Sequence, residues 1–120
     1  MGTDIHITSL KAIKALPLPV KRALKKLGSD IRDARKRRRI STVTMSERAM
    51  INRRTLLKVE HGEPSVSMGI YATVLFILGM TDRIADIADP SHDQIGLDLE
   101  GENLPKRIYS PRRRPNEQGS

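Results

Sequence analysis

The sequence predicts an all-α fold, a compact bundle of five or six helices, and three observations lead to this prediction. Apolar residues recur at steps of three and four residues from residue 20 to residue 88. A Ser, Thr or Asn precedes most of these stretches, and a Gly or Pro follows them, as expected at helix ends. Alternation of apolar and polar residues, which is typical of a strand, occurs only loosely, within residues 1–7.

The longest predicted helix spans residues 20–38, after a short helix that ends near residue 16 and is followed by two prolines. Gly28 lies inside the long helix at a cost of about 1 kcal/mol relative to Ala, so it marks either a kink or the true start, with Ser29 as the cap. The apolar positions form one stripe: Leu24, Leu27, Ile31 and Ala34.

Two short helices follow, over residues 42–49 and 53–60. Ser41 or Thr42 caps the first, and Asn52 caps the second after a three-residue turn. Gly62 is the glycine that ends the second helix. The expected core contacts of the pair are Val43, Met45, Ala49, Leu56 and Val59.

Three further helices are predicted towards the C-terminus. Ser67 caps a helix over 68–78 that is apolar nearly all round, which places it at the centre of the bundle or in a subunit interface. Thr81 caps a helix through Ala88, and a weaker helix covers 93–102. The predicted organisation is an N-terminal extension (1–19), a domain (20–89), a helical extension (90–104) and a basic, disordered tail (105–120).

Composition excludes several classes of protein. The chain has 120 residues and no Cys, which rules out disulfide scaffolds, thiolate zinc sites and thiol catalysis. It has no Trp, one Phe and two Tyr, which argues against single-strand binding by stacked aromatic side chains. No apolar stretch is long enough to span a bilayer, and the first ten residues lack the pattern of a secretion signal. We therefore expect a cytoplasmic, nucleoid-associated protein.

The charge is unevenly distributed along the chain. Lys and Arg number 22 against 14 Asp and Glu, a net charge of +8. Residues 1–39 carry a net charge of +9, residues 63–104 carry −7, and the tail from residue 105 carries +4. Positive charge at this density favours a polyanionic partner through counterion release, although cationic side chains also occur simply as solvated helix surface.

The two short helices and their turn have the dimensions of a helix-turn-helix motif. In such a motif the second helix buries one face and places the opposite face in the major groove of DNA. Leu56 and Val59 take the buried face, so Arg53, Arg54 and Lys58 project outward, where they can donate to guanine O6 and N7.

Contacts to phosphate are expected around these base contacts. Asn52 and the free N–H groups at the start of the second helix lie near a phosphate, and Thr42 reaches the backbone from the preceding helix. The basic run that contains Arg38 and Arg39 either contacts phosphate or is a solvated helix end beside the C-terminal dipole.

The part of the sequence that contains these two helices resembles a known family. Residues 24–79 are similar to the Cro/repressor-type (XRE) helix-turn-helix domain, the lambda-repressor-like fold, in the stretches "LGSDIRDARKRRRIS", "TVTMSERAMINRRTLLKVEHGEPSVSM" and "YATVLFILGM". Within that family, "SERAMINRRTLLKVEHGEPSVSMGIYATVLFILGM" followed by "LPKRIYSPRRR" is most similar to HipB-like antitoxins, which accompany HipA-type kinase toxins.

The resemblance implies roles for matching positions. It assigns base contacts to Arg53, Arg54 and Lys58, and phosphate contacts to a second set of residues. It also implies an ion pair that locks the second helix of the motif onto the long helix. The phosphate set is Thr42, Asn52 and Thr55, and the ion pair is Arg35 with Glu60.

Two positions depart from the family pattern. Met50 stands where the family often has a left-handed Gly, so either the turn costs about 1 kcal/mol or its shape differs. Ser46 replaces a small Ala and is itself small enough to keep the close approach of the two helices.

Other candidate sites carry less weight. The sequence offers no catalytic constellation, no phosphate-binding loop and no expected cofactor, and the three His residues are too dispersed for a metal site. Hence we do not expect an enzyme. Four acidic residues are spaced along one face of a helix, which is either solvated or a docking surface for a basic partner. These residues are Asp82, Asp86, Asp89 and Asp93.

The expected function is sequence-specific binding of double-stranded DNA by a homodimer that represses transcription. Two half-sites about one turn (~34 Å) apart in a palindromic operator give the discrimination that one monomer lacks. The resemblance adds autoregulation of a toxin–antitoxin operon and binding of a HipA-type kinase. The alternatives are an interaction protein without operator binding and an RNA-binding adaptor. The candidate dimer contacts are Ile84, Ile87, Leu97 and Leu99.

Overall fold

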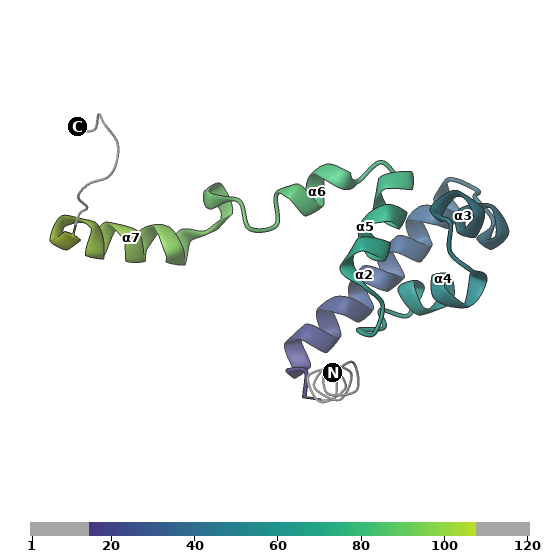
Figure 1. Ribbon diagram of the computed structural model, residues 1–120, viewed down its shortest axis with the longest axis horizontal. Helices are drawn as coiled ribbons and strands as arrows, with labels where there is room; N and C mark the ends of the chain where they lie inside the picture. Colours follow the sequence, from purple (N-terminus) through teal and green to yellow (C-terminus); the bar gives the residue numbers. More distant parts are fainter. Residues whose placement is uncertain (1–14, 108–120) are drawn as a thin grey trace, which may run out of the picture. The chain divides into compact units, whose positions relative to one another are not determined.

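A computed structural model describes the backbone of residues 15–107 and the side chains of residues 15–102. Over this range the regular elements are six α-helices, α2 to α7, and one 3-10 turn, η1, with no strand (Figure 1). The all-α class is therefore confirmed. The predictions for residues 1–14 and for the tail beyond residue 107 lie outside the described residues. The described residues fall into two compact units, which meet in sequence between Thr81 and Asp82.

Helix α2 (Leu18–Arg37) begins two residues earlier than predicted. Pro19 lies in its first turn, where the missing N–H group removes no helical hydrogen bond. The predicted stripe faces the core of the first unit, because Ile31 and Ala34 are buried and Leu24 and Leu27 are half-buried. The helix thus contributes its second half to the core more completely than its first.

Gly28 lies within α2 and allows close packing against the end of α4 (Arg53–Glu60). A Cβ at Gly28 would lie 2.5 Å from the backbone N of Gly62 and 2.6 Å from the carbonyl oxygen of Val59. Gly62 itself has a φ of 70° and meets the backbone of Leu24 just as closely. The unfavourable helix propensity of Gly28 is therefore offset by the contact between two backbones, and the residue does not mark the start of the helix, which begins at Leu18.

Helix α3 (Thr42–Ala49) is capped by Ser41, whose Oγ accepts a hydrogen bond from the N–H of Thr44 at 3.0 Å. Met45, Ser46 and Ala49 are its buried residues. The prediction that Val43 is a core contact was wrong: its side chain is 45% exposed. At 100° per residue, position 43 points away from the side shared by the three buried positions.

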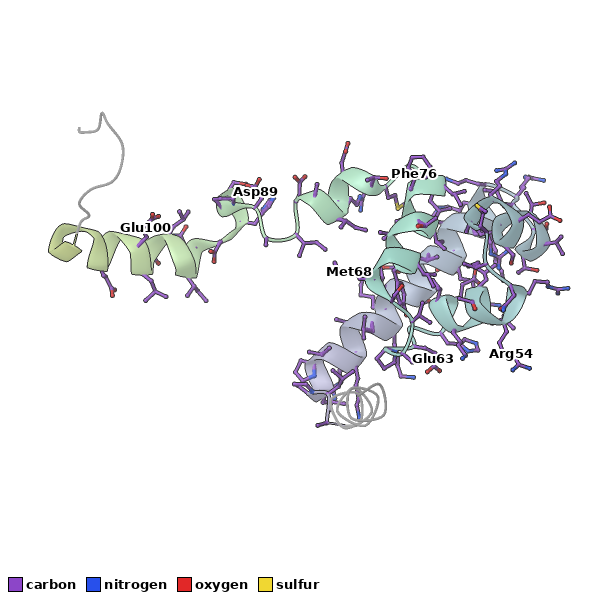
Figure 2. All side chains as sticks on the ribbon, viewed as in Figure 1. Arg54, Glu63, Met68, Phe76, Asp89 and Glu100 are labelled. Carbon is purple, nitrogen blue, oxygen red and sulfur yellow. The ribbon has the colours of Figure 1, made fainter. Side chains whose placement is uncertain are left out.

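Helix α5 (Met68–Ile77) is capped by Ser67, whose Oγ accepts a hydrogen bond from the N–H of Ile70 at 3.2 Å. Although the helix is apolar on every side, only one side is covered by the first unit. Val74 and Tyr71 are buried, whereas Met68 and Phe76 are each 66% exposed (Figure 2). The predicted central position is therefore correct for one side of α5 alone.

The second unit departs from the predicted boundaries. Helix α6 (Thr81–Ala85) ends three residues earlier than expected, and Thr81 belongs to the helix instead of capping it. Asp89 caps the turn η1 (Pro90–His92). Its carboxylate accepts hydrogen bonds from both the N–H and the hydroxyl group of Ser91. Because α6 ends at Ala85 and η1 follows it, the four acidic residues from 82 to 93 do not lie on one face of a single helix.

Helix α7 (Gln94–Arg107) continues through residues 105–107, so the prediction of a disordered tail from residue 105 is wrong for these three residues. Asp93 stabilises its start by accepting from the N–H of Gly96 at 3.0 Å. No helix among the described residues is long and apolar enough to cross a bilayer.

Tyr71 ties α5 to the loop that follows α4. Its hydroxyl donates to the carbonyl oxygen of Glu63 at 2.8 Å. Burial and the nearby Glu63 carboxylate raise the pKa of Tyr71 to about 12. The phenol is thus held in its neutral form, in which it can donate this hydrogen bond.

We expect Gly28→Ala to destabilise the first unit by about 1–3 kcal/mol, because the added methyl group overlaps backbone atoms that cannot move independently. This loss would exceed the helix-propensity gain of about 1 kcal/mol. The measurement is urea denaturation. Gly69→Ala is the matched control, since a Cβ there meets nothing closer than 3.8 Å, and it should be neutral or mildly stabilising. Equal stability of the two variants would contradict the close approach.

Alkaline pH should weaken the fold through Tyr71. The unfolded side chain ionises at its ordinary pKa of 10.0 and the folded one at about 12. Between these values the unfolded state has released a proton that the folded state retains, so rising pH favours unfolding. Tyr71→Phe has no group to ionise here, so only the wild type should lose stability in this way. The urea midpoints of the two proteins should therefore converge, or cross, as the pH rises through this interval. A constant difference between the two proteins would contradict the shift.

Candidate nucleic-acid interface

The candidate interface is built on α3, α4 and the turn between them. The turn, Met50 to Asn52, has the left-handed conformation at Met50, with φ 57° and ψ 41°. The N–H of Ile51 closes the turn by donating to the carbonyl oxygen of Ser46 at 3.0 Å. Met50 therefore adopts the left-handed conformation that Gly usually takes. For a residue with a side chain this conformation costs about 1–2 kcal/mol. That side chain is 91% exposed.

Asn52 starts α4 as predicted. Its Oδ1 accepts from the N–H of Thr55 at 2.7 Å, which satisfies one of the free donors of the first turn. The amide group of Asn52 is exposed and Thr55 is half-buried. The cap defines where α4 begins and so which residues occupy its first turn, Arg53 and Arg54.

Helix α4 has two distinct faces. Leu56 and Val59 are fully buried. Arg53, Arg54 and Lys58 are exposed, and Arg54 points away from the fold in Figure 2. All three predicted base-contact residues are therefore accessible. Arg54 and Lys58 lie opposite the part of the helix that packs against the unit, whereas Arg53 lies in the first turn nearer to the packed side.

The predicted pair of Arg35 and Glu60 is present and buried. Nε and Nη2 of Arg35 donate to the two carboxylate oxygens of Glu60, at 2.6 and 3.1 Å. The third donor, Nη1, reaches the carbonyl oxygen of Ile40 at 3.0 Å. The two side chains are only 9% and 3% exposed. This two-pronged geometry gives both strength and orientation, so α4 is held against α2 at a defined angle.

The predicted phosphate contacts differ in their surroundings. Thr42 is the first residue of α3 and is half-buried. Arg38 and Arg39 are exposed at the end of α2, and Nη1 of Arg38 donates to the carbonyl oxygen of Ala34 at 2.9 Å. Arg38 therefore stabilises the end of its own helix through one nitrogen of its guanidinium group.

Two exposed residues of this segment were not singled out from the sequence. Leu57 is 50% exposed and lies between Arg54 and Lys58 along α4. Arg48 is exposed in the last turn of α3. The signal for Leu57 is its position directly after the buried Leu56, which turns it away from the stripe. An aliphatic side chain there suits contact with a thymine methyl group.

The four predicted dimer contacts lie in the second unit, and none of their side chains is buried there. Ile84 is half-buried, whereas Ile87, Leu97 and Leu99 are 68%, 43% and 51% exposed. Ile95, which was not predicted, is 76% exposed. No group of three or more metal-ligating side chains occurs among the described residues.

Comparison of the chain with protein-family models, with curated proteins and with solved structures gave no match.

A double-mutant cycle tests the ion pair. Glu60→Gln or Arg35→Met alone should each destabilise the first unit by about 3–5 kcal/mol, because the remaining group stays buried without its partner. The combined variant should lose less than the sum of the two losses. Chemical denaturation of the four proteins gives the coupling energy, and a coupling near zero would refute the structural role of the pair.

Proposed function

We propose that this protein is a sequence-specific, double-stranded DNA-binding repressor of the helix-turn-helix type. The observation that carries the proposal is the division of α4 into a buried, anchored face and an exposed cationic face. Leu56, Val59 and the pair with Arg35 hold one face, and Arg54 and Lys58 lie on the other. A helix presented in this way fits the width of the major groove.

The base contacts follow from the chemistry of the exposed side chains. Arg53 and Arg54 are in the first turn of α4, the part of a recognition helix that approaches base edges. An Arg side chain donates two parallel hydrogen bonds to O6 and N7 of guanine. Lys58, one turn later, reaches an adjacent base pair, and Leu57 contacts a thymine methyl group.

Phosphate contacts supply most of the affinity. Thr42 and Asn52 begin two helices whose first N–H groups attract a phosphate oxygen. Arg38 and Arg39 add cationic charge at the end of α2, and each neutralised phosphate releases counterions. These contacts orient the protein on the duplex without reading its sequence.

A repressor of this type needs to act as a dimer, because one helix contacts too few base pairs to distinguish an operator from other DNA. Two copies related by a two-fold axis would place two recognition helices in successive major grooves, about 34 Å apart, on a palindromic operator. From the resemblance of residues 46–80 and 104–114 we also propose that the protein is an antitoxin, which represses its own operon and binds a HipA-type kinase toxin.

The base-contact assignment predicts the behaviour of Arg54→Ala. A duplex selected from a random library by the wild type should bind this variant more weakly by about 1–3 kcal/mol, and the preference at one base position should relax. Binding to random-sequence duplex should change little. The measurement is a gel shift over a salt series, on the selected duplex and on the DNA upstream of the protein's own reading frame.

Arg32→Ala is the matched control, because it removes the same charge from an exposed position of α2, outside α4. An equal loss on selected and random duplex would make Arg54 a phosphate contact. Absence of any preferred duplex would overturn the proposed function and leave an interaction protein. Equal competition by structured RNA would favour an RNA-binding adaptor instead.

A further inference from the structure

The second unit carries an exposed surface that is both acidic and aliphatic. Residues 82–102 contain seven acidic side chains and one Arg, a net charge of −6. None of these residues is buried. On α7, Ile95 and Leu99 share one side with Asp98 and Glu102, because they follow at steps of three and four. Exposed aliphatic side chains framed by charge are typical of a surface that binds a partner.

Like charge argues against pairing of this surface with its own counterpart in another copy. Two segments of net charge −6 would repel at contact distance, and a juxtaposition of like charges costs several kcal/mol in an interface. The aliphatic residues of the second unit therefore need a cationic partner surface that also offers apolar contact.

The start of α2 is such a surface. Residues 18–27 contain four basic side chains and no acidic one. None of them is buried, and Leu18 and Val20 are 55% and 40% exposed. Val20 continues the stripe that is buried further along at Ile31, so apolar surface emerges from the core here. In Figure 1 this end of α2 extends beyond α4 and α5.

We propose that residues 82–102 of one copy dock onto residues 18–27 of a second copy of this chain. The side of α7 with Ile95 and Leu99 covers the stripe at Val20, and acidic residues face Lys21 and Lys25. A two-fold axis generates the same contact a second time with the roles exchanged, so the dimer is closed. The inference extends the proposed function by supplying two-fold pairing, and it does not depend on DNA binding.

Charge reversal on each surface tests the docking. One variant is Lys21→Glu with Lys25→Glu, and the other is Asp98→Lys with Glu102→Lys. Sedimentation equilibrium of the full chain should show a wild-type dimer that weakens as salt is raised. Each variant should dissociate at least about tenfold more readily, because like charges then meet at both contacts.

The decisive measurement is an equimolar mixture of the two variants. In a mixed dimer one contact is native and the other has both charges reversed, so complementarity returns and the dimer should re-form. Urea denaturation and circular dichroism of each variant alone show whether it remains folded. A monomeric wild type, a variant that stays dimeric, or a mixture that stays monomeric would each overturn the proposal.

The same samples separate this proposal from the proposed function. Arg54→Ala should remain dimeric while it loses its preferred duplex. A dimer that follows the charge-reversal rules but binds no duplex would overturn the proposed function alone. Sequence-specific binding by a protein whose dimer ignores the reversals would overturn only the docking.

Discussion

The buried ion pair between Arg35 and Glu60 joins parts of the first unit that are 25 residues apart in the sequence. A third hydrogen bond from Arg35 holds the carbonyl group of Ile40, at the entry to α3. One guanidinium group thus connects the end of α2, the loop before α3 and the last turn of α4. A carboxylate at the C-terminal end of a helix opposes the helix dipole, so Glu60 needs the cation to be tolerated there.

The orientation of α4 follows from this connection and from two backbone features. The close approach of Gly28 and Gly62 lets α2 and the end of α4 touch without side chains between them. The left-handed Met50 turns the chain sharply enough for α4 to follow α3 after three residues. With its inner face held in this way, the helix leaves Arg54 and Lys58 exposed, and this exposure is the basis of the proposed DNA contact.

The two units differ in what stabilises them. The first has a core with fully buried side chains such as Met45 and Val74, whereas residues 82–102 bury none. Helices without tertiary contacts are marginal in water, because most helix stability in proteins comes from packing of an apolar face. The exposed aliphatic residues of α7 are therefore the basis of the proposed docking onto a second copy of the chain.

Local signals in the sequence determined the helices of the first unit, because Ser41, Asn52 and Ser67 act on donors three residues away and need no distant partner. The resemblance placed Arg35 opposite Glu60, which no local pattern reveals. Tertiary structure alone decided two points. Val43 and Phe76 are exposed because apolar character does not say which side of a helix is covered. Gly28 is a packing contact because its neighbour at Gly62 is distant in sequence. The early end of α6 and the length of α7 also escaped prediction, because weakly packed helices end where small differences in local energy place them.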